Sequence, residues 1–151
     1  MKIELRVIDE TNKDDVILLA VSDSQNQYIA SNKESLKTAA EEEYKTIARS
    51  FAIYAYDNLV GFTMFAYDVD YSDSNDRYWL WRFMIDKNLQ GRGYGSAALQ
   101  KVIEYFRSNG ADHIRLSTKE SNTAALSLYH KYKFKKTGEM NDEEVVLQLS
   151  L

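Results

Sequence analysis

Residues 83–96 read Phe83-Met84-Ile85-Asp86-Lys87-Asn88-Leu89-Gln90-Gly91-Arg92-Gly93-Tyr94-Gly95-Ser96. They begin within an aromatic and branched run, residues 78–85, whose composition is typical of a buried strand. They end where apolar residues at positions 99, 102, 103 and 106 follow the repeat of an amphipathic helix. A glycine-rich turn between a strand and a helix presents unpaired backbone N–H groups at the positive end of the helix dipole, which favours a phosphate group. Arg92 adds a full positive charge for the same anion.

The spacing of the glycines separates this turn from two common nucleotide motifs. The dinucleotide pattern G-x-G-x-x-G fails because Ser96 follows Gly95, and a Walker loop fails because the chain has no matching Gly-Lys-Ser/Thr. The alternative is a turn that starts a helix and contains incidental glycines. Three of the six glycines of the chain lie within residues 91–95, and this concentration favours phosphate binding.

The hydrophobic pattern of the whole chain predicts the element order β-α-α-β-β-β-α-β-α-β-β. The expected strands are residues 3–7, 51–56, 59–67, 78–85, 113–117, 134–138 and 145–149. The expected helices are a short one after Thr11, a longer one from Ser31 or Asn32 through Leu36, Ala40 and Tyr44 or Ile47, one that Gly110 ends, and one over residues 122–132. Glu41, Glu42 and Glu43 are expected on the polar face of the second helix, and Asp57-Asn58 in a tight turn. Hairpins combined with helical crossovers imply an α/β fold, a mixed sheet covered by helices.

Composition excludes several classes of function. The 151 residues include no Cys and only two His, which leaves no thiol nucleophile, no disulfide and no zinc centre to expect. A formal net charge of −4 argues against general nucleic-acid binding, but a cationic partner could still be drawn to a local acidic patch. The Asp-rich residues 68–79 lack the glycine and glutamate of a calcium loop, so we expect no metal site.

Two further features concern location. The N-terminus has no apolar signal-peptide core, and the apolar run at residues 16–21 is far shorter than the ~20 residues that cross a bilayer. We therefore expect one cytoplasmic domain over residues 1–151, without a membrane partner.

Two motifs together resemble the GNAT superfamily of acyl-CoA N-acyltransferases. The turn from Gln90 to Gly95 is similar to the family's Q/R-x-x-G-x-G/A pyrophosphate motif. Asn122, Ala125, residues 126–129 and Phe134 resemble its N-x-x-A-x-x-L-Y-x-x-x-G-F segment, with Lys133 where the family usually has Gly. The resemblance implies a mostly antiparallel central sheet of about seven strands flanked by about four helices, with one splayed strand pair that binds the cofactor.

The resemblance also implies a site for acetyl-CoA. Backbone groups of Phe83, Met84 and Ile85 would hold the pantetheine arm. The pyrophosphate would lie against Gly91, Arg92, Gly93, Tyr94, Gly95 and Ser96, with Gln90 and Arg92 at the mouth. Asn122 would contact the cofactor from the other side, and Ser117 and Thr118 would lie at the edge of the same gap.

The family's chemistry is direct attack of a neutral amine on the acetyl thioester, which needs no nucleophilic side chain and agrees with the absence of Cys. Tyr129 matches the tyrosine that protonates the departing CoA thiolate; otherwise it is a core aromatic of an amphipathic helix. The residue that takes the proton of the amine has no candidate in the sequence. Trp81 could offer a π-face to an ammonium group or could simply pack in the core.

The N-terminal half suggests the acceptor. Residues 21–31 and the segment Trp79-Leu80-x-Arg82-Phe83 look similar to bacterial spermine/spermidine acetyltransferases. The acidic residues 41–43 and 68–76 could attract a polycation, or could be solvated surface. The expected amine-binding residues are Tyr28, Glu42 and Trp81, and the expected oligomer is a homodimer. Alternatives are an acetyltransferase for an aminoglycoside, an amino acid or a protein N-terminus, and a non-catalytic acyl-CoA-binding module.

Overall fold

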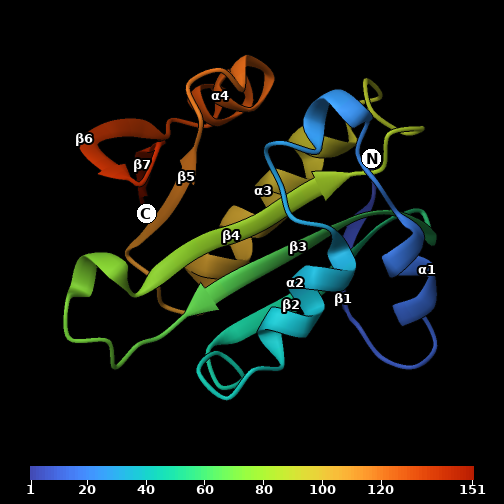
Figure 1. The fold of residues 1–151 in the computed structure, drawn as a ribbon, viewed down its shortest axis with the longest axis horizontal. Coiled ribbons are helices and arrows are strands. Elements are labelled where there is room, and N and C mark those ends of the chain that lie inside the picture. The colour runs from blue at the N-terminus through green and yellow to red at the C-terminus, as the bar shows by residue number, and fades with distance from the viewer.

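The computed structural model describes all 151 residues and has the predicted order of elements (Figure 1). The strands are β1 (Ile3–Val7), β2 (Ala48–Ala55), β3 (Asn58–Tyr67), β4 (Tyr78–Ile85), β5 (His113–Thr118), β6 (Lys135–Asn141) and β7 (Glu144–Ser150). The helices are α1 (Lys13–Leu18), α2 (Asn32–Ala39), α3 (Tyr94–Ser108) and α4 (Thr123–Lys131), with short 3₁₀ turns η1 (Asp23–Gln25) and η2 (Ser74–Asp76). No helix combines the length and the apolar composition that a bilayer crossing requires.

The seven strands form one sheet in the order β1-β2-β3-β4-β5-β7-β6. Every neighbouring pair is antiparallel except β4 and β5, which are parallel. The expectation of a mixed, mostly antiparallel sheet of seven strands with four helices is therefore confirmed.

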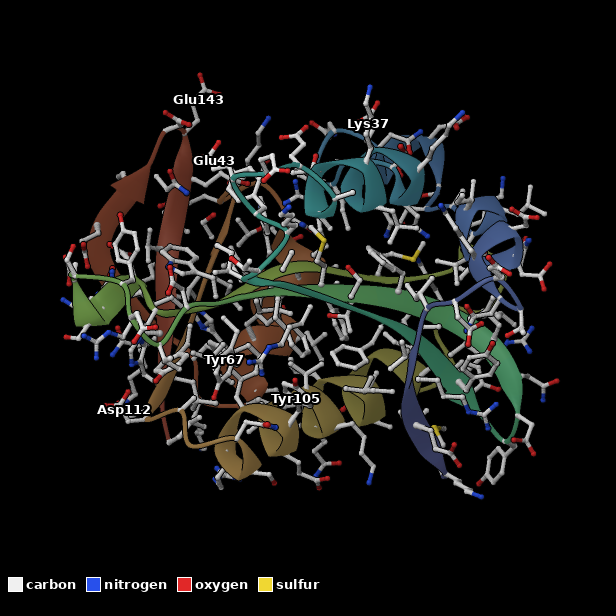
Figure 2. The ribbon with its side chains drawn as sticks, turned by 90° about the horizontal axis from the view of Figure 1, so that it is seen from below. Lys37, Glu43, Tyr67, Tyr105, Asp112 and Glu143 are labelled. Carbon is white, nitrogen blue, oxygen red and sulfur yellow. The ribbon has the colours of Figure 1, made fainter.

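Helices cover both faces of the sheet. Helices α1 and α2 lie on one face and α3 on the other (Figure 2). Under α1 and α2, a small apolar cluster forms around Val16, Phe62, Met64 and Met84. The largest cluster lies on the opposite side and includes the predicted apolar positions of α3, namely Leu99, Val102, Ile103 and Phe106. The spacing of those residues therefore identified the buried face of α3.

Gly110 ends α3 as predicted. It adopts a φ of +90°, its N–H donates to the Arg107 carbonyl, and the N–H of Ala111 donates to the Phe106 carbonyl. These two bonds form a Schellman motif, which satisfies carbonyls that the helix end would leave unpaired.

The prediction for the second helix was wrong in length. Helix α2 ends at Ala39, and residues 40–47 form turns, so Glu41, Glu42 and Glu43 do not lie on a helix face. Three adjacent carboxylates are unfavourable at the negative end of a helix dipole. Leaving the helix also lets Tyr44 pack edge-on against Trp81, with ring centroids 5.0 Å apart.

The β2–β3 hairpin differs from the prediction by a few residues. Strand β2 begins at Ala48 rather than 51, and Ala55 pairs with Asn58. The turn therefore consists of Tyr56 and Asp57, with φ of +50° and +68°, instead of Asp57-Asn58. Two consecutive positive φ angles are typical of the type I′ turn, whose twist matches that of the strands.

Strands β4 and β5 diverge. Trp79 and Arg115, near the start of both strands, are their only paired residues, whereas β5 and β7 pair at six positions. The register between β3 and β4 shifts at the same place, because Arg82 pairs with Met64 and Leu80 with Phe65, which leaves Trp81 as a bulge. The strands therefore open toward their carboxyl ends, and this is the expected splayed pair.

Candidate active site

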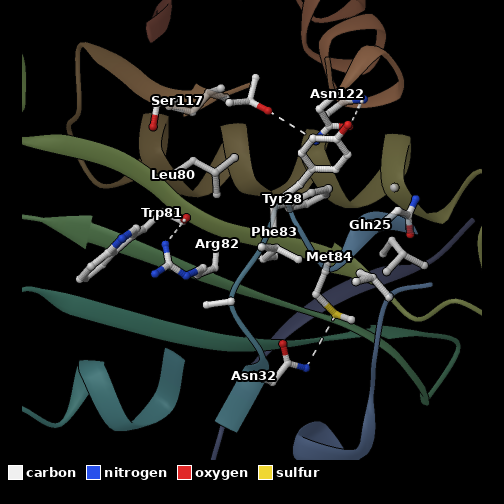
Figure 3. Close-up of a pocket in the computed structure, with 18 of the residues that line it drawn as sticks. Gln25, Tyr28, Asn32, Leu80, Trp81, Arg82, Phe83, Met84, Ser117 and Asn122 are labelled. Atoms are coloured by element: carbon white, nitrogen blue, oxygen red, sulfur yellow. Dashed lines mark hydrogen bonds between the residues drawn. The ribbon is translucent and has the colours of Figure 1, made fainter. Parts of the chain in front are cut away.

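A cleft of about 1130 Å³ lies in the opening between β4 and β5 (Figure 3). Its wall includes twelve of the residues proposed from the sequence: Tyr28, Trp81, Phe83, Met84, Ile85, Gln90, Gly91, Gly95, Ser117, Thr118, Asn122 and Tyr129. The remaining turn residues, Arg92, Gly93, Tyr94 and Ser96, continue from the wall into the start of α3 but do not line the cleft. The fold thus brings two separate motifs to one opening.

The glycine turn presents free hydrogen-bond donors. Gly91 and Gly93 have φ angles of +76° and +86°, which side chains other than glycine rarely adopt. No backbone N–H from Gly91 to Ser96 has a hydrogen-bond partner in the protein. Six consecutive donors at the N-terminus of a fifteen-residue helix are an arrangement that favours an anion such as pyrophosphate.

Two cationic side chains lie beside this turn. The Arg92 guanidinium is exposed and donates to the Asn88 carbonyl at 3.3 Å. Lys131 Nζ donates to Ser96 Oγ at 3.2 Å, at the start of α3. The positive charge that the sequence assigned to Arg92 is therefore supplemented by a lysine of α4.

Asp86 and Gln90 hold the turn in position. The Asp86 carboxylate is buried and accepts the N–H of Ala20 at 3.0 Å and the N–H of Asn88 at 3.1 Å. Gln90 Nε2 donates to the Ile85 carbonyl at 2.9 Å. Sequence reasoning missed the role of Asp86, because its partner Ala20 is 66 residues away and no local pattern marks it.

Residues 22–31 cross the cleft and join its two sides, and we call this segment the strap. On one side the amides of Gln25 and Gln90 donate to each other, at 3.0 and 3.2 Å. On the other side Tyr28 Oη donates to Ser121 Oγ at 3.2 Å, in the turn before α4. Figure 3 shows Tyr28 between Asn122 and Phe83, and all three residues line the cleft.

Asn122 and Tyr129 reach the cleft from α4. Asn122 caps the helix by accepting the N–H of Ala125, and it also donates to Thr118 Oγ1 at 3.4 Å. Tyr129 is buried against Phe134, and burial raises the pKa of its hydroxyl above the ordinary range. This hydroxyl has no hydrogen-bond partner in the protein. Because every fully enclosed side-chain polar atom of the protein does have a partner, the Tyr129 hydroxyl is not fully enclosed. The Tyr129 hydroxyl is therefore accessible from the cleft and holds its proton firmly.

Trp81, the bulge residue of β4, also lines the cleft. Tyr44 packs against its ring, and the Arg82 guanidinium lies 5.1 Å from the ring centroid. Arg82 donates to Ser35 Oγ and the Trp81 carbonyl, and burial lowers its pKa, which the charge of Glu144 partly offsets. The wall contains two carboxylates, Glu34 and Glu144.

The structure separates Glu42 from this site. Glu42 does not line the cleft; its exposed carboxylate pairs with Lys45 at 2.9 Å. Glu144 does line it, but no feature of the sequence distinguishes Glu144 from its neighbours Asp142 and Glu143. The only available signal was strand alternation from the hairpin turn, which needs the exact position of the turn.

Comparison with known proteins agrees with this geometry. The model of the "Acetyltransferase (GNAT) family" matches residues 18–134. Two curated relatives are each 33% identical over 153 residues, covering 98% of this chain and 99% of their own: a probable spermine N(1)-acetyltransferase of Bacillus subtilis subsp. natto (strain BEST195) and a spermine/spermidine N(1)-acetyltransferase of Bacillus subtilis (strain 168).

Among solved structures, spermidine N-acetyltransferase from Vibrio cholerae, in complex with CoA and spermine, has a similar fold. The TM-score is 0.72 at 17% identity, over 99% of this chain and 94% of that one. At this identity the likeness concerns the fold alone.

Proposed function

Because the protein belongs to the GNAT family of acetyltransferases, we propose that its acceptor is a primary amine of a polyamine such as spermine or spermidine. The protein is an acetyl-CoA-dependent N-acetyltransferase. One observation carries the choice of acceptor: the 33% identity, over nearly the full length, to two relatives named for spermine.

The six unpaired backbone N–H groups of residues 91–96 support the assignment of acetyl-CoA as the cofactor of this chain. They would bind the pyrophosphate, with Gln90, Arg92 and Lys131 around them. Phe83, Met84 and Ile85 would hold the pantetheine arm, because β4 has no strand partner on its β5 side beyond Trp79. Asn122 would contact the arm from α4. Bound acetyl-CoA supplies the thioester that the amine attacks.

Tyr129 is the proposed general acid. Its hydroxyl is accessible from the cleft, has no competing hydrogen bond, and is protonated at neutral pH, as an ordinary phenol already is; burial raises its pKa further. A proton from Tyr129 Oη would neutralise the thiolate sulfur as the C–S bond breaks. General acid catalysis of this kind contributes about 10²- to 10⁴-fold to a rate.

The composition of the wall suits a cationic acceptor. Glu34 and Glu144 oppose a single cleft cation, Arg82. Trp81 and Tyr44 also line the cleft, and a free face of either ring would attract an ammonium group by about 0.5–2 kcal/mol.

Arg82 favours a second candidate. An amino-acid acceptor could pair its carboxylate with this guanidinium, which has no carboxylate within ion-pair distance in the protein. The two candidates differ in the charge of the acceptor, so substrate preference distinguishes them.

A thiol-release screen with acetyl-CoA tests the acceptor. The panel contains spermine, spermidine, diamines, aminoglycosides and amino acids. We expect the highest kcat/KM for spermine or spermidine. Activity confined to amino acids would favour the second candidate, and silence on every polyamine would reject the proposal while leaving the family assignment intact.

The variant Tyr129→Phe tests the acid. We expect kcat to fall about 100-fold or more, while the Kd of acetyl-CoA, measured by calorimetry, changes less than about twofold. The exposed Tyr71→Phe serves as the control because Tyr71 lies outside the cleft. Unchanged kcat in Tyr129→Phe would remove Tyr129 from the mechanism.

A further inference from the structure

Glu144 is the first residue of β7 and lies beside the opened strand pair. Its carboxylate Oε1 accepts the hydroxyl hydrogen of Ser117, on β5, at 3.0 Å. Glu144 is half-buried and lines the cleft, whereas Asp142 and Glu143, in the turn before it, are exposed and do not. The fold therefore selects one carboxylate of an acidic turn and directs it into the site.

The Glu144 carboxylate can accept further hydrogen bonds. Oε2 has no hydrogen-bond partner, and no Lys or Arg lies within 4.0 Å of either oxygen. Arg82, whose pKa the charge of Glu144 raises, already donates to Ser35 Oγ and the Trp81 carbonyl. A partly desolvated carboxylate without a counterion gains most from an incoming cation.

Glu144 lies at the end of the cleft that contains Trp81, the bulge residue of β4. Figure 3 shows Ser117 on the same side of the view as Trp81 and Arg82, with Gln25 at the opposite side. The glycine turn, where the anion-binding donors lie, is joined to Gln25 through Gln90. Negative charge and aromatic faces thus lie at one end of the cleft and anion-binding donors at the other.

We infer that Glu144, positioned by Ser117, binds an ammonium group of the acceptor and so determines the preference for cationic amines. The inference rests on the proposed function, because it names the residue that recognises the polyamine. Tyr44 and Trp81 would border the same ammonium group, and Ser117 would keep the carboxylate in one orientation by occupying Oε1.

The variant Glu144→Gln removes the charge and keeps both the length of the side chain and an oxygen for the Ser117 hydroxyl. We expect the KM for spermine to rise about 10- to 100-fold, as for the loss of one charge-assisted hydrogen bond, with the Kd of acetyl-CoA unchanged. Glu143→Gln is the matched control: it makes the same change of net charge in the same turn, at a side chain exposed on the hairpin (Figure 2), and should leave the KM unchanged.

Two further readouts distinguish recognition from a structural role. The wild-type KM for spermine should rise with added salt, and this dependence should be weaker in Glu144→Gln. Glu144→Asp, which retains the charge, should recover part of the affinity. Melting temperatures of all variants within a few degrees of wild type establish that they fold; if Glu144→Gln melts early, Glu144→Asp and Ser117→Ala carry the comparison.

The outcomes separate the two proposals. A wild-type enzyme that acetylates polyamines, with equal KM values for Glu144→Gln and Glu143→Gln, would overturn the role of Glu144 and leave the proposed function standing. A wild-type enzyme inactive on all polyamines would overturn the proposed function and this inference with it.

Discussion

Gly95 lies in the first turn of α3 and lines the cleft, and replacing it with alanine should stabilise the fold without weakening cofactor binding. A Cβ at this position would lie 3.8 Å from Ile85 Cγ1 and 4.0 Å from Leu128 Cδ2, which are ordinary contacts. The backbone of Gly95 is not in the left-handed region, and alanine is the better helix former. The folded protein therefore has room for the methyl group.

The motif Q/R-x-x-G-x-G/A accepts Gly or Ala at this position, so the methyl group is compatible with the unpaired N–H groups at the start of α3. Alanine should stabilise the helix by about 0.5–1 kcal/mol, which is a rise in Tm of about 1–4 °C for a chain of this size. A scan of melting temperature measures this rise, and titration calorimetry should give a Kd of acetyl-CoA within about twofold of wild type.

Gly61→Ala is the reference, because the same substitution there should have the opposite result. Its Cβ would lie 2.3 Å from the backbone oxygen of Met84, so the β3–β4 ladder must shift. We expect a loss of about 1–3 kcal/mol, which is a fall in Tm of about 2–12 °C for a chain of this size. Gly95→Ala with a Kd of acetyl-CoA raised about tenfold or more, or with a Tm loss equal to that of Gly61→Ala, would refute the reasoning.

Three more changes test other parts of the site. Burial raises the pKa of Tyr129, so its contribution to stability is complete below pH ~10 and is lost above it; between pH 9 and 11 wild type should lose about 1.4 kcal/mol more than Tyr129→Phe in chemical denaturation. Asp86→Ala leaves the N–H of Ala20 without its partner and should lower the free energy of unfolding by about 2 kcal/mol, measured with urea. Tyr28→Phe removes the bond to Ser121 and should speed CoA dissociation about 2- to 10-fold in stopped-flow measurements, with little change in Tm; an unchanged rate would mean that the strap does not retain the cofactor.

The order of elements could be predicted because it depends on local periodicity. Alternation in β1 and the apolar spacing of α3 each need only a single strand or helix, and Gly110 ends α3 through its own backbone freedom. The glycine turn was also predictable, since adjacent residues supply both its shape and its donors.

What the sequence did not reveal depends on contacts between distant segments. The end of α2 depends on Tyr44 packing against Trp81, 37 positions further along the chain. It also depends on Glu41, Glu42 and Glu43, which would fit the surface of a helix as well as they fit the turns that they form. Asp86 acts through Ala20, and Glu144 through Ser117. Glu42 attracted attention by charge alone, but charge does not say which carboxylates face the cleft.

The divergence of β4 and β5 has a consequence for the integrity of the sheet. Two strands in its middle each have an unpaired side, so the molecule has two internal edges besides the outer ones at β1 and β6. Exposed edges invite pairing with other chains, but here the strap crosses the opening, where it would obstruct a foreign strand. Deleting the strap should therefore do more than open the site: we expect chains to associate through these internal edges, and free CoA to suppress the association by occupying the place of the missing strand.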